Sequence, residues 1–212
     1  ATKVIDVAGA SNVLINNADI TLSKNSAVTT MGISVSANSD NVVINGSDID
    51  VSSASQGLVW NEDSTGNWYS TLAASAVVVD DSTNVKIANG SIKIQNTTSN
   101  LTGTTMPALT ITSGASNVEV YNNTINATGA QYNYGIMCND YVSNLDIKYN
   151  RVNVTGEMYT AGMDVSTSTS SEVKYNNITA TSSNSSVLAS GSEALSYGIV
   201  LATYQVHNNN NV

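Results

Sequence analysis

The sequence predicts an all-β chain that folds as a right-handed parallel β-helix of about six to seven coils, with three short strands in each coil. Three observations support this fold class. A short unit recurs along nearly the whole chain, apolar and polar residues alternate within it, and its turns are rich in Asn and Gly. Such alternation is typical of a strand with one buried face, and a unit this short must stack on its neighbours to bury that face.

Two of the three strands are marked by the pattern Asn-Val-x-Ile, a short turn rich in Asn and Gly, and Ile-x-Val. The clearest copies read "NVLINNADITL", "NVVINGSDIDV", "NVKIANGSIKI", "NVEVYNNTINA" and "NLDIKYNRVNV", followed by the shorter "SEVKYNNITA" and "YQVHNNNNV". The second apolar position recurs at Ile15, Ile44, Ile87, Val120, Ile147, Val173 and Val206. We expect each of these strands to pair in parallel with its counterpart in the next coil, about 4.8 Å away.

The third strand precedes each later copy, as "GISV", "VVVD", "LTIT", "GIMC", "GMDV" and "GIVL". With it, residues 1–212 are expected to form one β-helix domain, a fragment of a longer surface protein whose flanking coils would be its neighbours. Asn123, Asn150 and Asn176 share one register at the bend between the first two strands, where Asn tolerates left-handed backbone and can form ladders. Gly46 and Gly90 are expected at the same bends with positive φ.

The connections before the third strand vary most in length. The longest is an insertion over residues 53–75, and solenoid insertions often cluster on the binding face. It holds the residues of the hypothesised ligand site, in which aromatic rings stack on sugars and carboxylates bond hydroxyl groups. These residues are Trp60, Trp68, Tyr69, Glu62 and Asp63. The alternative is that the aromatic side chains pack down onto the side of the helix.

Three other groups have structural interpretations. Glu119, Asp146 and Glu172 fall on one outward row beside Lys148 and Lys174, which favours a surface charge ladder over a cation or acid–base site. Cys138 occupies an inward position and is expected in the core. Tyr149 and Tyr175 share an outward register, which predicts a stacked row; a sugar-binding strip is the alternative.

Composition excludes several classes of function. The formal net charge is −9 with only seven Lys and Arg residues, so a nucleic-acid partner is not expected. No apolar run approaches the roughly 20 residues that span a bilayer, so no membrane insertion is expected in this segment. One cysteine rules out an internal disulfide framework. No cofactor and no metal site are predicted.

With Asn-Val-x-Ile, Asn-Asn-x-Ile and Tyr-Gly-Ile in sequence order, the chain resembles the right-handed parallel β-helix repeat superfamily. The copies "YNNTINATGAQYNYGIMC" and "YNNITATSSN…LSYGIVLAT" are most similar to the Asn/Thr-rich adhesin-like surface proteins of methanogenic archaea. The resemblance covers about residues 12–212 and implies an extracellular or cell-surface module for adhesion or surface display. Its expected partner is a host or microbial cell-surface glycan or protein.

The alternative function is a polysaccharide-active lyase or glycoside hydrolase on the same scaffold. Lyases with this fold use a basic residue together with acidic Ca²⁺ ligands. The only Arg here is Arg151, at a bend aligned with Thr124 and Asn177, and the Gly-His-Gly pattern of pectin hydrolases is absent. Binding without chemistry is therefore the favoured prediction.

Overall fold

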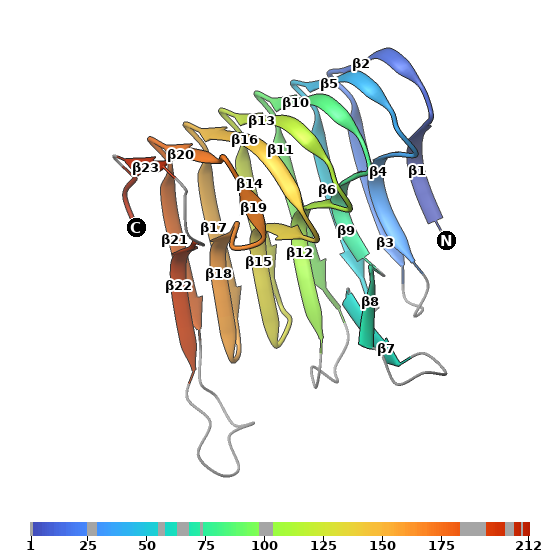
Figure 1. The fold of residues 1–212 in the computed structure, drawn as a ribbon. Coiled ribbons are helices and arrows are strands. Elements are labelled where there is room, and N and C mark those ends of the chain that lie inside the picture. The colour runs from blue at the N-terminus through green and yellow to red at the C-terminus, as the bar shows by residue number, and fades with distance from the viewer. Residues whose placement is uncertain are drawn as a thin grey trace.

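The computed structural model describes residues 2–24, 29–54, 58–62, 68–72, 74–97, 104–182, 194–201, 206–208 and 210–212. For 58–62, 68–72 and 206–208 the description covers the backbone alone. Within these ranges the chain is all-β, with three parallel sheets that run the length of the molecule (Figure 1). The strands of all three sheets lie perpendicular to the long axis, as stacked coils require.

Sheet A contains, in spatial order, β1 (Thr2–Ala8), β4 (Thr30–Ser36), β9 (Ala74–Asp80), β12 (Thr105–Thr112), β15 (Tyr132–Asn139), β18 (Tyr159–Asp164) and β22 (Leu195–Val200). Sheet B contains β2 (Ser11–Asn16), β5 (Asp40–Asn45), β10 (Thr83–Ala88), β13 (Ser116–Tyr121), β16 (Val142–Lys148), β20 (Glu172–Lys174) and β23 (Val206–Asn208), with β19 (Ser168–Thr169) beside β16. Sheet C contains β3 (Asp19–Lys24), β6 (Asp48–Ser53), β11 (Ser91–Asn96), β14 (Thr124–Thr128), β17 (Arg151–Gly156) and β21 (Asn177–Ser182).

The chain passes through sheets A, B and C in turn, and each strand pairs in parallel with the equivalent strand one coil away. Six coils contain all three strands, and β22 and β23 follow them. The predicted parallel β-helix with three strands per coil is therefore confirmed. Because the parallel strands pair in register, residues at equivalent positions of successive repeats lie next to one another and form a row along the helix axis.

The core is a set of such rows. Ile44, Ile87, Val120 and Ile147 are mutual neighbours along sheet B, and each is at most 2% exposed. Burying a side chain of this size contributes roughly 1.5–3 kcal/mol, so each coil adds a similar stabilising layer. Small residues are needed where sheet A approaches sheet C: a Cβ at Gly162 would lie 2.1 Å from the Ile178 side chain.

The bend between sheets B and C differs from the prediction by one residue. The left-handed residue is the one directly after each sheet B strand, with φ between 52° and 60° at Asn17, Gly46, Asn89, Asn122, Tyr149 and Tyr175. Asn123, Asn150 and Asn176 follow this position and do not have positive φ. Gly46 is left-handed as predicted, but Gly90 is not; a Cβ at Gly90 would lie 2.3 Å from the Ser47 carbonyl oxygen.

The long connections all join sheet C to sheet A, between β6 and β9, β11 and β12, and β21 and β22. This confirms that the length variation clusters on one edge of the helix. The insertion over residues 53–75 contributes an antiparallel pair, β7 (Leu58–Glu62) and β8 (Trp68–Leu72), and β7 contacts β12 of sheet A. Among the described residues, the corners that border sheet B are short, so no long insertion is seen there over its outer face.

Candidate functional site

The hypothesised ligand residues of the insertion lie on the β7–β8 pair. Trp60 pairs with Ser70, and Glu62 lies directly opposite Trp68. Tyr69 pairs with Asn61. Asp63 lies outside the described residues, as do the side chains of the other four. The backbone register thus brings Glu62 and Trp68 together, and the ligand site itself stays a prediction.

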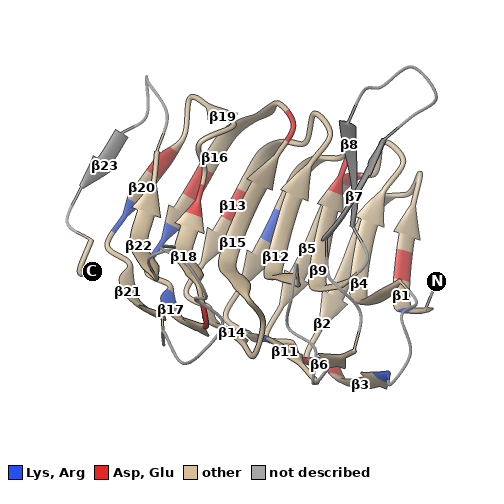
Figure 2. Ribbon diagram, turned by 90° about the horizontal axis from the view of Figure 1, so that it is seen from below, with Lys and Arg blue, Asp and Glu red and all other residues tan. Residues whose placement is uncertain are grey.

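The outer face of sheet B, from β10 to β20, is the best-defined candidate surface; we call it the sheet B face. One outward row of this face consists of charged residues in register: Lys86, Glu119, Asp146 and Glu172. Lys148 and Lys174 lie in the neighbouring row, two residues further along their strands. Figure 2 shows the acidic positions on β13, β16 and β20 with basic positions beside them.

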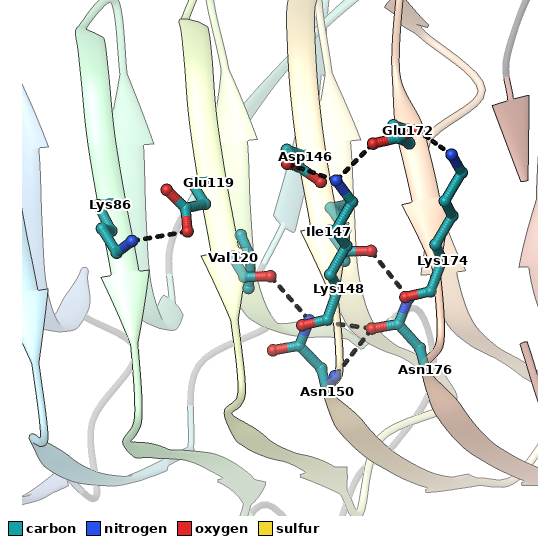
Figure 3. Close-up of polar contacts among 10 residues, drawn as sticks. All are labelled: Lys86, Glu119, Val120, Asp146, Ile147, Lys148, Asn150, Glu172, Lys174 and Asn176. Atoms are coloured by element: carbon teal, nitrogen blue, oxygen red, sulfur yellow. Dashed lines mark hydrogen bonds and ion pairs between the residues drawn. The ribbon is translucent and has the colours of Figure 1, made fainter.

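The charges of this face neutralise one another. Lys86 Nζ lies 2.7 Å from Glu119 Oε1. Lys148 Nζ bridges two carboxylates, at 2.9 Å from Asp146 and 2.5 Å from Glu172. Lys174 also donates to Glu172, which completes a continuous chain of ion pairs across β16 and β20 (Figure 3). The interpretation of this row as a surface charge ladder is therefore confirmed.

The ion pairs shift the pKa values of Glu172 and Lys148 in the directions that favour their charged forms. Hydrogen bonds from Lys148 and then Lys174 lower the pKa of the Glu172 carboxyl. The hydrogen bond to Glu172, followed by that to Asp146, raises the pKa of the Lys148 ammonium group. A general acid needs a carboxyl pKa raised towards neutrality, so Glu172 is poorly suited to donate a proton. The described residues also contain no group of three His, Cys, Asp or Glu side chains that could hold a metal ion.

A row of tyrosines borders the sheet B face at its bend to sheet C. The rings of Tyr149 and Tyr175 are stacked, with centroids 5.0 Å apart and planes 13° apart. Tyr121 meets Tyr149 edge-on at 5.4 Å. These three side chains are 37–49% exposed. The predicted stacked row is confirmed, and because two ring faces are turned towards each other, the row presents mainly ring edges and hydroxyl groups to solvent.

Tyr141 lies at the opposite edge of the same face and was not singled out by sequence reasoning. It has φ 44° and is 89% exposed, and Asp140 before it has φ 59°. The register places Tyr141 where an earlier coil has Gly114, because Thr112 pairs with Asn139. A large aromatic residue at a position where another repeat has Gly was the signal that could have identified it.

Two amide ladders follow one another along the bend between sheets B and C, and they meet at Asn122 and Asn123. The exposed ladder consists of Asn16, Asn45, Asn89 and Asn122, and each Nδ2 donates to the Oδ1 of the preceding member at 2.8–2.9 Å. The buried ladder consists of Asn123, Asn150, Asn176 and Asn210, joined at 3.0–3.1 Å. Members of the buried ladder also accept a backbone N–H from the preceding coil. The predicted structural role of these Asn residues is confirmed.

The remaining candidates are structural or isolated. Cys138 is 3% exposed, and burial raises the pKa of its thiol, so it lacks the thiolate character of a nucleophile. Arg151 is exposed on sheet C between Thr124 and Asn177, on a different sheet from the carboxylates of the sheet B face. A second tyrosine cluster lies on sheet A, with ring centroids 5.3–6.4 Å apart; it consists of Tyr132, Tyr134, Tyr159 and Tyr197.

The described residues contain no helix long and apolar enough to cross a membrane. The chain was also compared with known proteins. No protein-family model matches it, and no curated protein sequence does so either. No solved structure matches it. The classification of this chain therefore rests on its fold, a parallel β-helix.

Proposed function

We propose that this chain is an extracellular, adhesin-like β-helix module for adhesion or surface display, and that it binds carbohydrate along the sheet B face. The observation that carries the proposal is the exposed tyrosine row, in which Tyr149 and Tyr175 have a left-handed backbone conformation. Tyr149 and Tyr175 occupy sites where the preceding coils have Asn89 and Asn122. A left-handed conformation costs a residue with a Cβ roughly 1–2 kcal/mol, and Asn tolerates it best. Tyrosine at two successive sites therefore favours a role beyond stability.

The surroundings of the row suit a glycan. Lys148 and Lys174 directly precede the two tyrosines in the chain, and their side chains keep 22–25% exposure while they pair with Asp146 and Glu172. Aromatic edges supply apolar contact, while hydroxyl, ammonium and carboxylate groups supply the donors and acceptors that sugar hydroxyls need. Coils repeat about every 4.8 Å, comparable with one sugar residue of an extended polysaccharide. Weak contacts repeated along one chain add up through effective concentration.

The paired state of the carboxylates supports binding in preference to the alternative, a polysaccharide lyase or hydrolase. Such enzymes work with carboxyl groups that exchange protons near neutral pH. In the sheet B face, the lowered pKa of Glu172 keeps this carboxyl ionised. The cell-surface glycan is accordingly the partner we propose, with an extracellular or cell-surface location.

The test is a glycan array followed by calorimetry with the best ligand. The decisive variant is Tyr149→Asn with Tyr175→Asn, which retains a residue suited to left-handed backbone. We expect it to weaken binding at least about tenfold, as loss of central aromatic contacts does. The double variant Trp60→Ala with Trp68→Ala should bind as the parent chain does.

Two results would overturn this assignment. Binding that survives the tyrosine changes but is lost with the tryptophan changes would place the ligand on the β7–β8 pair. An array with no bound glycan would leave surface display without carbohydrate recognition, and would move the search to protein partners. Circular dichroism of each variant controls for folding.

A further inference from the structure

A pocket of about 300 Å³ lies at the corner between sheets A and B, lined by Asp140, Tyr141 and Thr167. Two coils build it. Asp140 and Tyr141 form the corner between β15 and β16, whereas Thr167 belongs to the equivalent corner of the next coil, between β18 and β19. Thr167 Oγ1 donates a hydrogen bond to the Cys138 carbonyl oxygen at 2.9 Å, which holds this corner against the preceding coil.

The polar groups that line this pocket are mainly acceptors. Within the described part of the chain, the Asp140 carboxylate has no ion pair and no side-chain hydrogen bond. The Thr167 hydroxyl proton is already donated to Cys138, which leaves its oxygen lone pairs. None of the three lining residues is basic. A ligand that complements this lining must bring its own donors, and preferably a positive charge.

The aromatic residue of the pocket, Tyr141, is exposed and can contact a cation, although its backbone adopts a strained left-handed conformation. Tyr141 is held with φ 44° and 89% of its side chain exposed, next to Asp140 with φ 59°. The equivalent position of the preceding coil is Gly114, with φ 80°, which adopts this conformation without strain. An exposed tyrosine ring next to a carboxylate combines cation–π attraction with charge pairing.

We propose that this pocket binds an organic cation, of the class of alkylammonium groups such as a lysine side chain or a small amine. The formal net charge of −9 raises the local concentration of cations around the whole molecule. A metal ion is a poorer fit, because the lining offers a single carboxylate and hard divalent cations require six or more oxygen ligands. The site is independent of the proposed carbohydrate row, which follows the other edge of the sheet B face.

The test is a titration of the ¹⁵N-labelled chain with n-butylammonium chloride, compared with sodium chloride at the same ionic strength. We expect saturable shifts of the Asp140, Tyr141 and Thr167 amide signals with butylammonium alone. Asp140→Asn and Tyr141→Asn should each weaken binding about two- to fivefold, the range of one exposed cation–π or charge contact. Tyr141→Asn should also raise the unfolding midpoint, since Asn relieves the strained position.

The matched control is Tyr149→Asn, which relieves the same kind of strain at the other edge of the sheet. It should leave butylammonium binding unchanged; because it also removes the ring contacts with Tyr121 and Tyr175, its unfolding midpoint serves only to show that the variant is folded. The proposal is overturned if sodium gives the same shifts as butylammonium, or if Tyr141→Asn is stabilised and still binds like the parent chain. Circular dichroism checks that both variants are folded, so that a failed fold cannot explain the outcome.

Discussion

Asparagine side chains hold the bend between sheets B and C in both the earlier and the later coils of the helix, but they do so in two different ways. In the earlier coils, the exposed ladder from Asn16 to Asn122 ties the bend from outside. In the later coils, the buried ladder from Asn123 to Asn210 ties it from inside, and Tyr149 and Tyr175 take over the outer position. Asn122 and Asn123 are consecutive, so the two ladders meet at one bend. The later coils therefore have their outer surface free for other side chains.

The two ladders differ in what each amide satisfies. Asn150 Oδ1 accepts from both the backbone N–H and the side chain of Asn123. Its Nδ2 donates to the carbonyl oxygens of Val120 and Lys148 and to Asn176. A member of the exposed ladder has water as an alternative partner. Removing a buried amide leaves donors and acceptors without partners, whereas removing an exposed one does not.

The largest expected effect is therefore that of Asn150→Ala. We expect it to destabilise the chain by about 3 kcal/mol, because it orphans buried backbone groups in two coils. The measurement is the urea midpoint of unfolding, followed by circular dichroism, against the parent chain. A loss below about 1 kcal/mol would mean that water enters the bend and replaces the amide.

Substitutions in the exposed ladder should change the stability less, and mainly through their effect on the backbone conformation. Asn122 has φ 52° and donates to Asn89 at 2.9 Å. We expect Asn122→Gly to change stability by less than about 0.5 kcal/mol, as is usual for surface sites. Asn122→Ala should cost about 1 kcal/mol more than the Gly variant, since Ala is strained at positive φ. The same urea series measures both; equal midpoints for the two variants would show that the bend relaxes to negative φ.

The difference between the ladders also shows what the sequence could predict. The repeat period fixes which residues stack, because parallel pairing in register turns sequence spacing into spatial rows; Asn123, Asn150 and Asn176 were found in this way. The period does not say which of two adjacent bend residues turns inward, so the left-handed position was misplaced by one residue. The charge ladder that contains Lys148 could also be predicted from these rows. The insertion has no period, and its ligand residues remain a prediction.

Tyr141 illustrates the other limit of the sequence. Its row is visible from the spacing, but the pocket beside it also needs Thr167 from the corner after β18, whose hydroxyl group donates to the Cys138 carbonyl oxygen. Such a side-chain contact between the corners of two successive coils does not follow from the repeat spacing. Local departures from a repeat, such as Tyr in a Gly position, are therefore the features to inspect when a solenoid lacks a recognisable motif.

The smallest expected effect is that of the exposed ion pairs, which should depend on pH, unlike the neutral amide ladders. Because the pKa of Glu172 is lower in the folded chain than its ordinary value, its stabilising effect is present above the unfolded-state pKa and is lost as the pH falls through the folded pKa. Glu172→Gln should lower the urea midpoint slightly at pH 7, and this difference should shrink as the pH falls below the ordinary glutamate pKa and vanish once the pH is below the folded pKa. High salt at pH 7 should reduce the difference too, since the pairs are exposed. The midpoint shift caused by Asn150→Ala should persist under all these conditions; if it also disappeared in acid, the stability of the buried bend would depend on the charges of the sheet B face.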